Sequence, residues 1–338
     1  MSFLSAPLRP LASPLLHGLL PRIDHRIEES SRPFDRPELL RPHVDSRLWA
    51  ATHYGVFIPQ LPEPLRYLNT MTLIGAAGAV VFDNDYLARP DARRTTTVLS
   101  STAAPGHHHY RAYDSHCDCN FGDDGTLLAW SDDLIIEADH PVYRLTARYE
   151  NFGADLTVTA TDQVSWFIRS PVYDHLSLLA TFSGSVDGTE VAGLCTVEYA
   201  RFMSPQSLSA KPLPEPLKLP IDFFTYQIIN IDDRTQLLLT DVRAAGVTAC
   251  RLAHVRSLDG TATVYDDVRP MSPSTNRCRP SIRRAERCGY PSSSAGPFAT
   301  TVACSHASPP VPTRHRATAT GAATSVPTAT PANSTAAR

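Results

Sequence analysis

The densest group of metal-binding residue types lies in the stretch GHHHYRAYDSHCDC, from Gly106 to Cys119. It contains four histidines, two cysteines and two aspartates. These are side chains that bind zinc, provided that they converge on one point at about 2 Å from the ion. The first question is therefore whether this stretch forms a metal site.

A strand through this stretch would separate the candidate ligands, because successive side chains of a strand point to opposite faces. One face would carry His108, Asp114, His116 and Asp118. The other would carry His107, His109, Tyr113, Cys117 and Cys119. We therefore expect a polar strand with hydrogen-bonded histidines and no metal site. If the first face lines a cavity, His116 and Asp114 become candidate catalytic residues; on the other face, Tyr113 is a candidate ligand contact.

Glu198 is a second candidate for chemistry, in the segment VAGLCTVEYARF. Strand alternation places it on one face with Leu194 and Thr196. Burial on such a face raises the pKa of a carboxyl group, and a neutral carboxylic acid can protonate an alkene or a carbonyl group. The alternative is a salt bridge from Glu198 to Arg201 or to a neighbouring strand.

Further candidate ligand contacts are histidines and aromatic residues near predicted strands. Three of them lie at or before the apolar run GVFIPQLPEPL: Trp49, His53 and Tyr54. His175 follows Asp174 at the start of a strand, where the two form either an acid–base pair or a turn cap. His254, in CRLAHVRS, is either an inward-facing core residue or a ligand contact.

Short apolar segments joined by tight turns must position these residues. From Thr72 onward, segments rich in Val, Ile, Leu, Thr and Tyr recur at a spacing of roughly ten residues. Asp-Gly pairs mark hairpin turns at Asp124-Gly125, Asp187-Gly188 and Asp259-Gly260. Helix-period segments do not separate the strands, so parallel βαβ units are not expected. We predict an all-β fold, an antiparallel meander of two lipocalin-like β-barrel units with the second incomplete.

The composition divides the chain into five parts. An irregular segment (1–45) precedes the first β unit (46–202), and a proline-rich linker (203–221) leads to a partial second β unit (222–270). Residues 271–338 contain eight arginines, one acidic residue and no hydrophobic period. This last part is expected to be either a disordered tail or the product of a reading-frame error.

Bulk properties exclude several functions. A net charge of −3 gives no support for nucleic acid as a partner. The sequence contains no run of eighteen apolar residues, so a transmembrane segment is not expected; weak membrane-surface contact remains open for residues 15–20. The seven cysteines are irregularly spaced, which favours reduced thiols and a cytoplasmic location. Nucleotide-binding and serine-hydrolase motifs are absent, and we expect no cofactor.

Three segments resemble an uncharacterised bacterial family related to carotenoid 1,2-hydratase and AttH-like proteins. They are HYGVFIPQLPEPLRYLNTMTLIG, VAGLCTVEYARF and FFTYQIINIDDRTQLLLTDVRAAG. In the second segment Gly193 and Glu198 match the family, whereas Val197 replaces its aromatic residue and the following Trp-Gly pair is absent. The resemblance spans roughly residues 40–270 and implies two lipocalin-like barrels that bind lipophilic molecules such as isoprenoids or polyketides.

These observations predict a protein that binds a lipophilic small molecule, of isoprenoid, polyketide or fatty-acid type, in a β-barrel cavity. The first alternative is an acid–base enzyme (a hydratase, cyclase or isomerase) with Glu198 as proton donor and a histidine as its partner. The second alternative is a truncated protein without activity.

Overall fold

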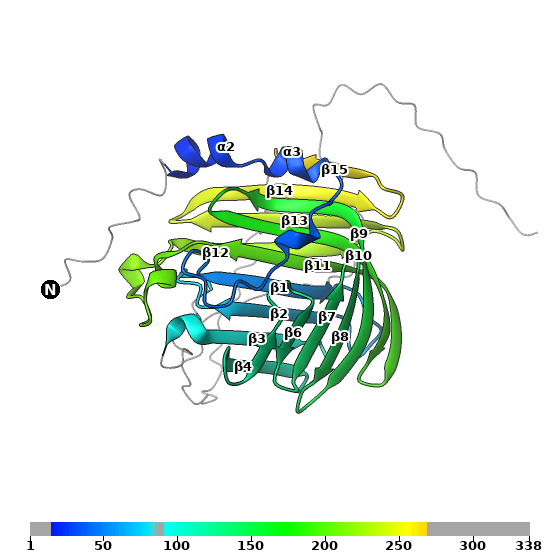
Figure 1. Cartoon of the computed structure of the whole chain (residues 1–338). Helices are drawn as coiled ribbons and strands as arrows, with labels where there is room; N and C mark the ends of the chain where they lie inside the picture. Colours follow the sequence, from blue (N-terminus) through cyan, green and yellow to red (C-terminus); the bar gives the residue numbers. More distant parts are fainter. Residues whose placement is uncertain (1–14, 83, 85–90, 269–338) are drawn as a thin grey trace, which may run out of the picture. The chain divides into compact units, whose positions relative to one another are not determined.

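Strands dominate the computed structural model, which describes residues 15–82, 84 and 91–268 (Figure 1). Short helices precede the first strand: a π-helical turn Leu15–Leu19, α2 (Leu20–Ile23), α3 (Arg26–Ser30) and a 3₁₀ turn Pro37–Leu39. None of the described helices is long and apolar enough to cross a membrane. Contact of residues 15–20 with a membrane surface stays a prediction. The predicted tail, 271–338, lies outside the described residues.

Eleven strands form one antiparallel sheet in the order β4-β3-β2-β1-β11-β10-β9-β8-β7-β6-β5. Their bounds are β1 Ala51–Ile58, β2 Leu68–Gly75, β3 Thr95–Ser101, β4 His108–Asp114, β5 Cys119–Phe121, β6 Leu127–Trp130, β7 Leu134–Asp139, β8 Val142–Arg148, β9 Gly153–Arg169, β10 Tyr173–Val186 and β11 Thr189–Phe202. A 3₁₀ turn, Ala92–Arg94, leads into β3. Each strand pairs with its neighbours in sequence, except that β1 pairs with β11 and β4 does not pair with β5.

This sheet curls into a nearly closed barrel whose two edges are β4 and β5 (Figure 1). Side chains cross the gap between the edges, since Arg111 and Tyr113 of β4 donate to the carboxylate of Asp133 at 2.8 and 2.7 Å. The Trp130 indole donates to the Thr96 hydroxyl at 2.8 Å, which links β6 to β3 across the interior. The barrel is therefore closed by side chains where ladder hydrogen bonds are missing.

Four more strands form a second antiparallel sheet in the order β12-β13-β14-β15. They are β12 Ile221–Asn230, β13 Thr235–Ala244, β14 Val247–Ser257 and β15 Ala262–Tyr265, and 3₁₀ turns Pro205–Leu208 and Glu215–Leu217 precede them. An all-β antiparallel fold, with one large barrel-like sheet and a smaller second sheet, confirms the predicted fold class. The predicted domain boundaries stay a prediction.

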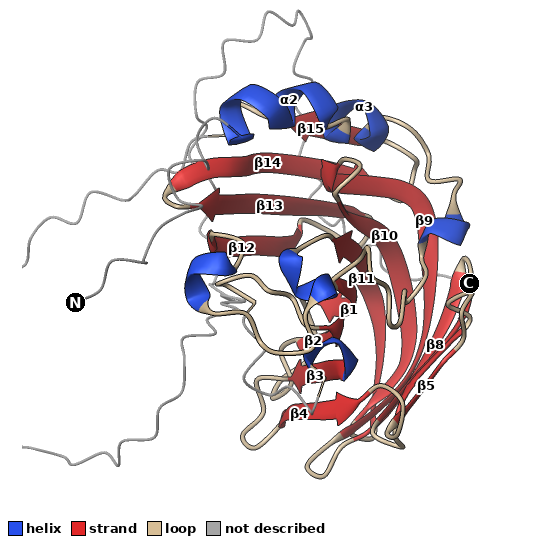
Figure 2. Ribbon diagram, turned by 60° about the vertical axis from the view of Figure 1, so that its left-hand side comes forward, coloured by secondary structure: helices blue, strands red, loops and turns tan. Residues whose placement is uncertain are grey.

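The small sheet covers the outer face of part of the barrel. Burial alternates along β9 from Ala154 to Ala160, as expected for a strand with one wet face, but residues 163–167 are all buried. The same continuous burial holds for all of β1, for residues 174–180 of β10 and for 194–200 of β11. Figure 2 shows β9 and β10 curving from the small sheet to the β5–β8 wall. Polar side chains on this covered face are therefore cut off from water.

Two glycines, Gly184 as the test position and Gly188 as the control, allow a test of the close packing of β9 on β10. Gly184 has φ +144° and faces Leu156, and an added Cβ would lie 2.0 Å from the Asp155 carbonyl oxygen, a backbone atom that cannot move aside. We expect Gly184→Ala to lower the free energy of unfolding by about 3 kcal/mol. In the control Gly188→Ala the residue has φ +76° and open space, so a loss of about 1 kcal/mol is expected. Urea unfolding at constant m-value measures both, and equal losses would contradict this packing.

Candidate functional site

Three neighbouring strands bring three buried titratable side chains to the same outer face. In the ladder, His53 of β1 and His175 of β10 both lie opposite Ala200 of β11. Glu198 lies two residues before Ala200, and residues two apart on a strand share a face. The register therefore places His53 and His175 on either side of Glu198, and their side chains are 2–8% exposed.

The Glu198 carboxylate is the centre of this cluster. His53 Nε2 lies 3.2 Å from Glu198 Oε2, and His175 Nε2 lies 3.6 Å from Glu198 Oε1. Tyr226, on β12 of the small sheet, donates its hydroxyl to Glu198 Oε2 at 3.1 Å. Both sheets thus contribute to one group of polar atoms, which we call the His–Glu cluster (His53, His175, Glu198 and Tyr226).

The far sides of the two imidazoles are also held. His53 Nδ1 donates to the Thr72 carbonyl oxygen at 2.8 Å, because a carbonyl can only accept. His175 Nδ1 lies 3.0 Å from the Tyr173 hydroxyl. Two buried atoms, His175 Nε2 and Glu198 Oε1, make no hydrogen bond with any described residue.

The electrostatics of Glu198 differ from the sequence-based expectation. Burial raises the pKa of Glu198, as predicted, but His175 and His53 outweigh that effect and hold the pKa at about 2. Burial lowers the pKa of His175, against the opposite influence of Glu198. The two histidines therefore favour the ionised carboxylate, and a proton-donating role of Glu198 stays a prediction that this arrangement does not favour. The alternative was a salt bridge to Arg201 or to a neighbouring strand. Its first form is wrong, since Arg201 pairs with Asp174 at 2.9 Å, and its second form is found, since Glu198 is paired with His53 of β1 and His175 of β10.

A buried arginine lies between the sheets near this carboxylate. Arg256 of β14 is 1% exposed and donates to the Ser177 carbonyl at 2.7 Å, the Ser177 hydroxyl at 3.0 Å and Gln236 Oε1 at 2.8 Å. Burial lowers the pKa of Arg256 to about 10, while Glu198 acts in the opposite direction. The guanidinium remains charged at neutral pH and joins the small sheet to β10.

A β-bulge shapes the aromatic wall beside the cluster. His175 pairs with Ile168 and Leu176 pairs with Trp166, so Phe167 is an extra residue in β9. Bulges re-aim side chains, and the Phe167 ring lies 4.6 Å from His175 between centroids. His254 of β14 lies 6.3 Å from the same ring.

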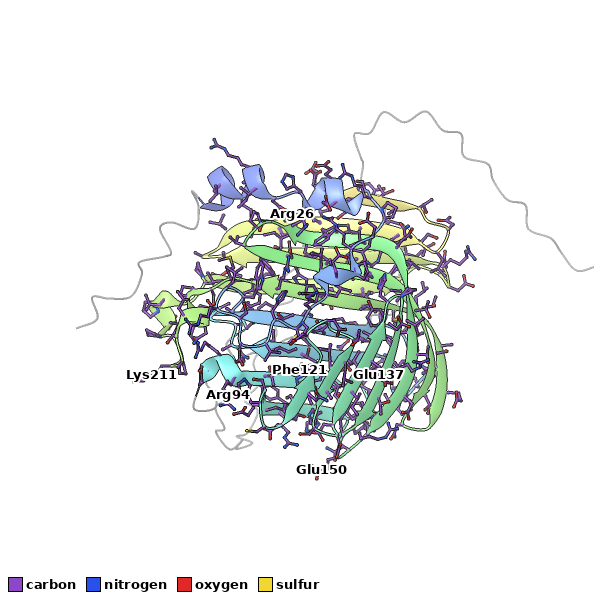
Figure 3. All side chains as sticks on the ribbon, viewed as in Figure 1. Arg26, Arg94, Phe121, Glu137, Glu150 and Lys211 are labelled. Atoms are coloured by element: carbon purple, nitrogen blue, oxygen red, sulfur yellow. The ribbon has the colours of Figure 1, made fainter. Side chains whose placement is uncertain are left out.

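A mostly apolar cavity of about 210 Å³ adjoins the His–Glu cluster between the sheets. Residues that line it include Phe167, Tyr173, His175, Met203, Ile221 and Phe224. Arg26 of α3, which is labelled in Figure 3, also lines it, but its guanidinium is already paired with Asp24 and donates to the Ala249 carbonyl. The other polar groups of this wall include the Tyr173 hydroxyl and the His175 imidazole, whose Nε2 lies 3.6 Å from the Glu198 carboxylate.

A second cavity, of about 300 Å³, lies on the barrel side of the same strands. Its wall includes Tyr54, Val56, Leu128, Ile136, Tyr143 and Val197. Tyr54 donates its hydroxyl to the Leu40 carbonyl at 2.9 Å. Val197 and Tyr199 belong to the interior core, so the Glu198 side chain, between them in sequence, leaves the strand on the opposite face.

The predicted candidates around GHHHYRAYDSHCDC do not join this site. The prediction of one strand through residues 107–119 is wrong, because β4 ends at Asp114 and the Asp118 N–H folds back to the Asp114 carbonyl. Asp114 pairs at 2.7 Å with Arg94, which is labelled in Figure 3. His116 pairs with Asp45 in an exposed position. Both lie at the β4 edge, three strands from β1.

The remaining sequence candidates are divided between core and surface. Tyr113 is fully buried in the barrel, and its hydroxyl bonds Asp133. The candidate Trp49 packs against Arg201, whose guanidinium lies 4.5 Å from the centre of the Trp49 ring. His53 and His175 were predicted as ligand contacts and Glu198 as catalytic, and the structure brings all three together.

Sequence reasoning missed Tyr173, Tyr226 and Arg256. A partial signal was present, because ATHYGVFI, HLSLLAT and CTVEYA each contain one residue of the cluster and no Lys, Arg, Asp or Glu other than Glu198 itself. Continuous apolar runs are typical of strands buried on both faces. A histidine or glutamate inside such a run is expected to be buried, in contrast to His108 of β4, which is exposed.

Comparison with known proteins gives the family but no activity. Residues 71–271, more than half of the chain, match the model of a family of unknown function (DUF6670). The chain belongs to this family. No curated protein matches.

Two solved structures show weak likeness. One is described as the crystal structure of CghA with Sch210972 (9% identity, TM-score 0.26), with 65% of this chain and 58% of that chain covered. The other is the S-type phycobiliprotein lyase CPES from Guillardia theta (8% identity, TM-score 0.20), with 53% and 97% covered. This chain thus spans 58% of the length of the first. Both TM-scores are too low to support a functional inference.

His254 provides a test of the water-free space between the sheets. It is 2% exposed and neither ring nitrogen has a hydrogen-bond partner among the described residues. Burial, aided by Arg256 and Arg26, lowers the pKa of His254 to about 3, so its stabilising effect is present above the unfolded pKa of 6.5 and is lost as pH falls towards 3. We expect His254 to lower the free energy of unfolding by about 2 kcal/mol when the pH falls from 7 to 5.

In His254→Leu, the loss of unfolding free energy between pH 7 and pH 5 should therefore be smaller by that amount. Guanidinium unfolding of wild type and variant at both pH values measures the difference. Parallel pH dependences for the two proteins would show that His254 titrates normally, and hence that water reaches it.

Proposed function

We propose that the protein binds a small, largely apolar molecule with one polar group in the cavity between the two sheets. The observation that carries this proposal is the apolar cavity of about 210 Å³ with His175 and Tyr173 in its wall. Apolar pockets with a few convergent polar groups and perturbed pKa values are typical ligand sites. The location differs from the sequence-based prediction, which put the ligand inside the barrel.

The size of the cavity limits the ligand. A protein cavity of about 150 Å³ accepts benzene, so about 210 Å³ suits a single ring with short substituents or a short branched chain. Larger isoprenoids or polyketides, which the family resemblance implies, would have to extend beyond this space. The ligand class is therefore a compact lipophilic molecule of about ten carbons.

The charges around the cavity favour a neutral polar group. Arg26 is occupied by Asp24 and by the Ala249 carbonyl, and His175 already lies beside the Glu198 carboxylate at 3.6 Å. A carboxylate entering this wall would lose water without gaining a free cation, which is costly. A hydroxyl or carbonyl group can instead exchange hydrogen bonds with Tyr173 or His175.

The acid–base alternative survives only with changed roles. The pKa of Glu198, at about 2, makes its carboxylate a base or a ligand rather than a proton donor. The hydratase-like match at Gly193 and Glu198 therefore supports no protonation step here. Whether the ligand is transformed is a separate question from whether it binds in this cavity.

A matched pair of alanines separates the two cavities. Ala249 of β14 lines the inter-sheet cavity, and Ala138 of β7 lines the barrel cavity. With the ten-carbon alcohol geraniol as probe, we expect wild type to bind, Ala249→Leu to weaken binding at least about tenfold by filling the space, and Ala138→Leu to leave it unchanged. Isothermal titration calorimetry on the full chain measures all three affinities.

Two results would contradict this proposal. One is a loss of geraniol binding in Ala138→Leu but not in Ala249→Leu, which would move the site into the barrel. The other is the absence of binding to folded wild type for geraniol, its aldehyde citral and its hydrocarbon analogue myrcene at millimolar concentration.

A further inference from the structure

We propose that His53, His175 and Glu198 bind a divalent transition-metal ion. Each residue offers one ligand atom, and these atoms all lie within 4.8 Å of one another. Ligands about 2.1 Å from a tetrahedral ion are about 3.4 Å apart. The two histidines face different oxygens of one carboxylate, His53 Nε2 at 3.2 Å from Oε2 and His175 Nε2 at 3.6 Å from Oε1, and each separation is close to that spacing.

The tautomer of His53 requires a positive species between it and Glu198. Its Nδ1 proton is used by the Thr72 carbonyl, so a neutral His53 presents a lone pair at Nε2. That lone pair lies 3.2 Å from Glu198 Oε2, another acceptor. Either a second proton on His53 or a cation between the two atoms removes this repulsion.

Two further atoms favour a metal ion over a proton. His175 Nε2 and Glu198 Oε1 are buried and have no hydrogen-bond partner in the described part of the chain, and their separation of 3.6 Å is too long for a hydrogen bond. A proton on His53 leaves both unsatisfied. One metal ion satisfies His53, His175 and Glu198 together.

Supporting groups match the pattern found around metal ligands. A histidine that binds a metal usually donates its other ring N–H to a carbonyl or another acceptor. His53 has the Thr72 carbonyl in that place and His175 has the Tyr173 hydroxyl. Glu198 accepts from Tyr226, as ligating carboxylates commonly do.

The donor set selects the kind of ion. Two imidazoles and one carboxylate suit Zn²⁺ or Fe²⁺, whereas Ca²⁺ and Mg²⁺ prefer oxygen ligands only. Three protein ligands leave at least one coordination position for water or another molecule. Because His175 also lines the cavity between the sheets, the ion would lie beside the proposed ligand. The metal inference nevertheless stands without the proposed function, since it is tested with no organic ligand present.

The test is metal binding to the purified full chain. After removal of metals with EDTA, wild type should bind one equivalent of Zn²⁺ in equilibrium dialysis with elemental analysis. Glu198→Gln and His175→Gln should weaken Zn²⁺ binding by more than about 100-fold, and Tyr173→Phe, which removes only a supporting group, by about 10-fold. The matched control is His254→Gln, a buried histidine of the same inter-sheet space that should bind Zn²⁺ as wild type does.

Two readouts on wild type keep the inference testable if a variant fails to fold. Co²⁺ should give the visible absorption of a nitrogen- and oxygen-ligated ion, and Zn²⁺ should raise the Tm of the EDTA-treated chain because it binds the folded state. Folded wild type that binds less than about a tenth of an equivalent, with no Tm shift, would overturn the inference. So would Zn²⁺ binding that Glu198→Gln, His175→Gln and His254→Gln all leave unchanged.

Discussion

The structure depends on one constraint: the small sheet covers the outer face of β1 and of parts of β9, β10 and β11, so the strands are buried on both sides there. In a barrel with a single core, the outer face of every strand would be wet, and a glutamate there would be an ordinary surface residue. Covering that face removes water from Glu198, His53 and His175. Every unusual property of the site follows from this exclusion of water.

Buried charges need partners, and the two sheets supply them to each other. Glu198, on the large sheet, receives the hydroxyl of Tyr226 from the small sheet. Arg256, on the small sheet, donates to Ser177 of the large sheet. A charge left alone in such a place would destabilise the fold by several kcal/mol. The polar groups therefore hold the sheets in one relative position as well as forming the site, and Phe167 at the β9 bulge fills the space between them.

The alternation of strand residues separates two compartments that share the same strands. Val197 and Tyr199 point into the barrel core, and Glu198 points into the space between the sheets. An apolar cavity lies on each side. The His–Glu cluster adjoins the inter-sheet cavity through His175, and the barrel cavity has its own hydrogen-bonded pair, His140 and Tyr143 at 2.9 Å. The proposed ligand and metal sites are both on the inter-sheet side. The barrel itself then acts as the rigid support that fixes the register of β1, β10 and β11.

The all-β class, the antiparallel meander and its turns were predictable from the amino-acid sequence, because strand alternation and Asp-Gly pairs are local properties of the chain. It also indicated three residues of the site one at a time: His53 before an apolar run, His175 at the start of a strand, and Glu198 by strand alternation. His116 and Asp114 were also predicted as candidate catalytic residues, but they lie at the β4 edge of the large sheet. The fold distinguishes the two groups of candidates. Pairing of β1 with β11 and docking of β12 bring His53, Glu198 and Tyr226 together although they are far apart in the chain. Alternation in a sequence indicates which residues share a face of a strand, but it does not indicate which face a second sheet will cover.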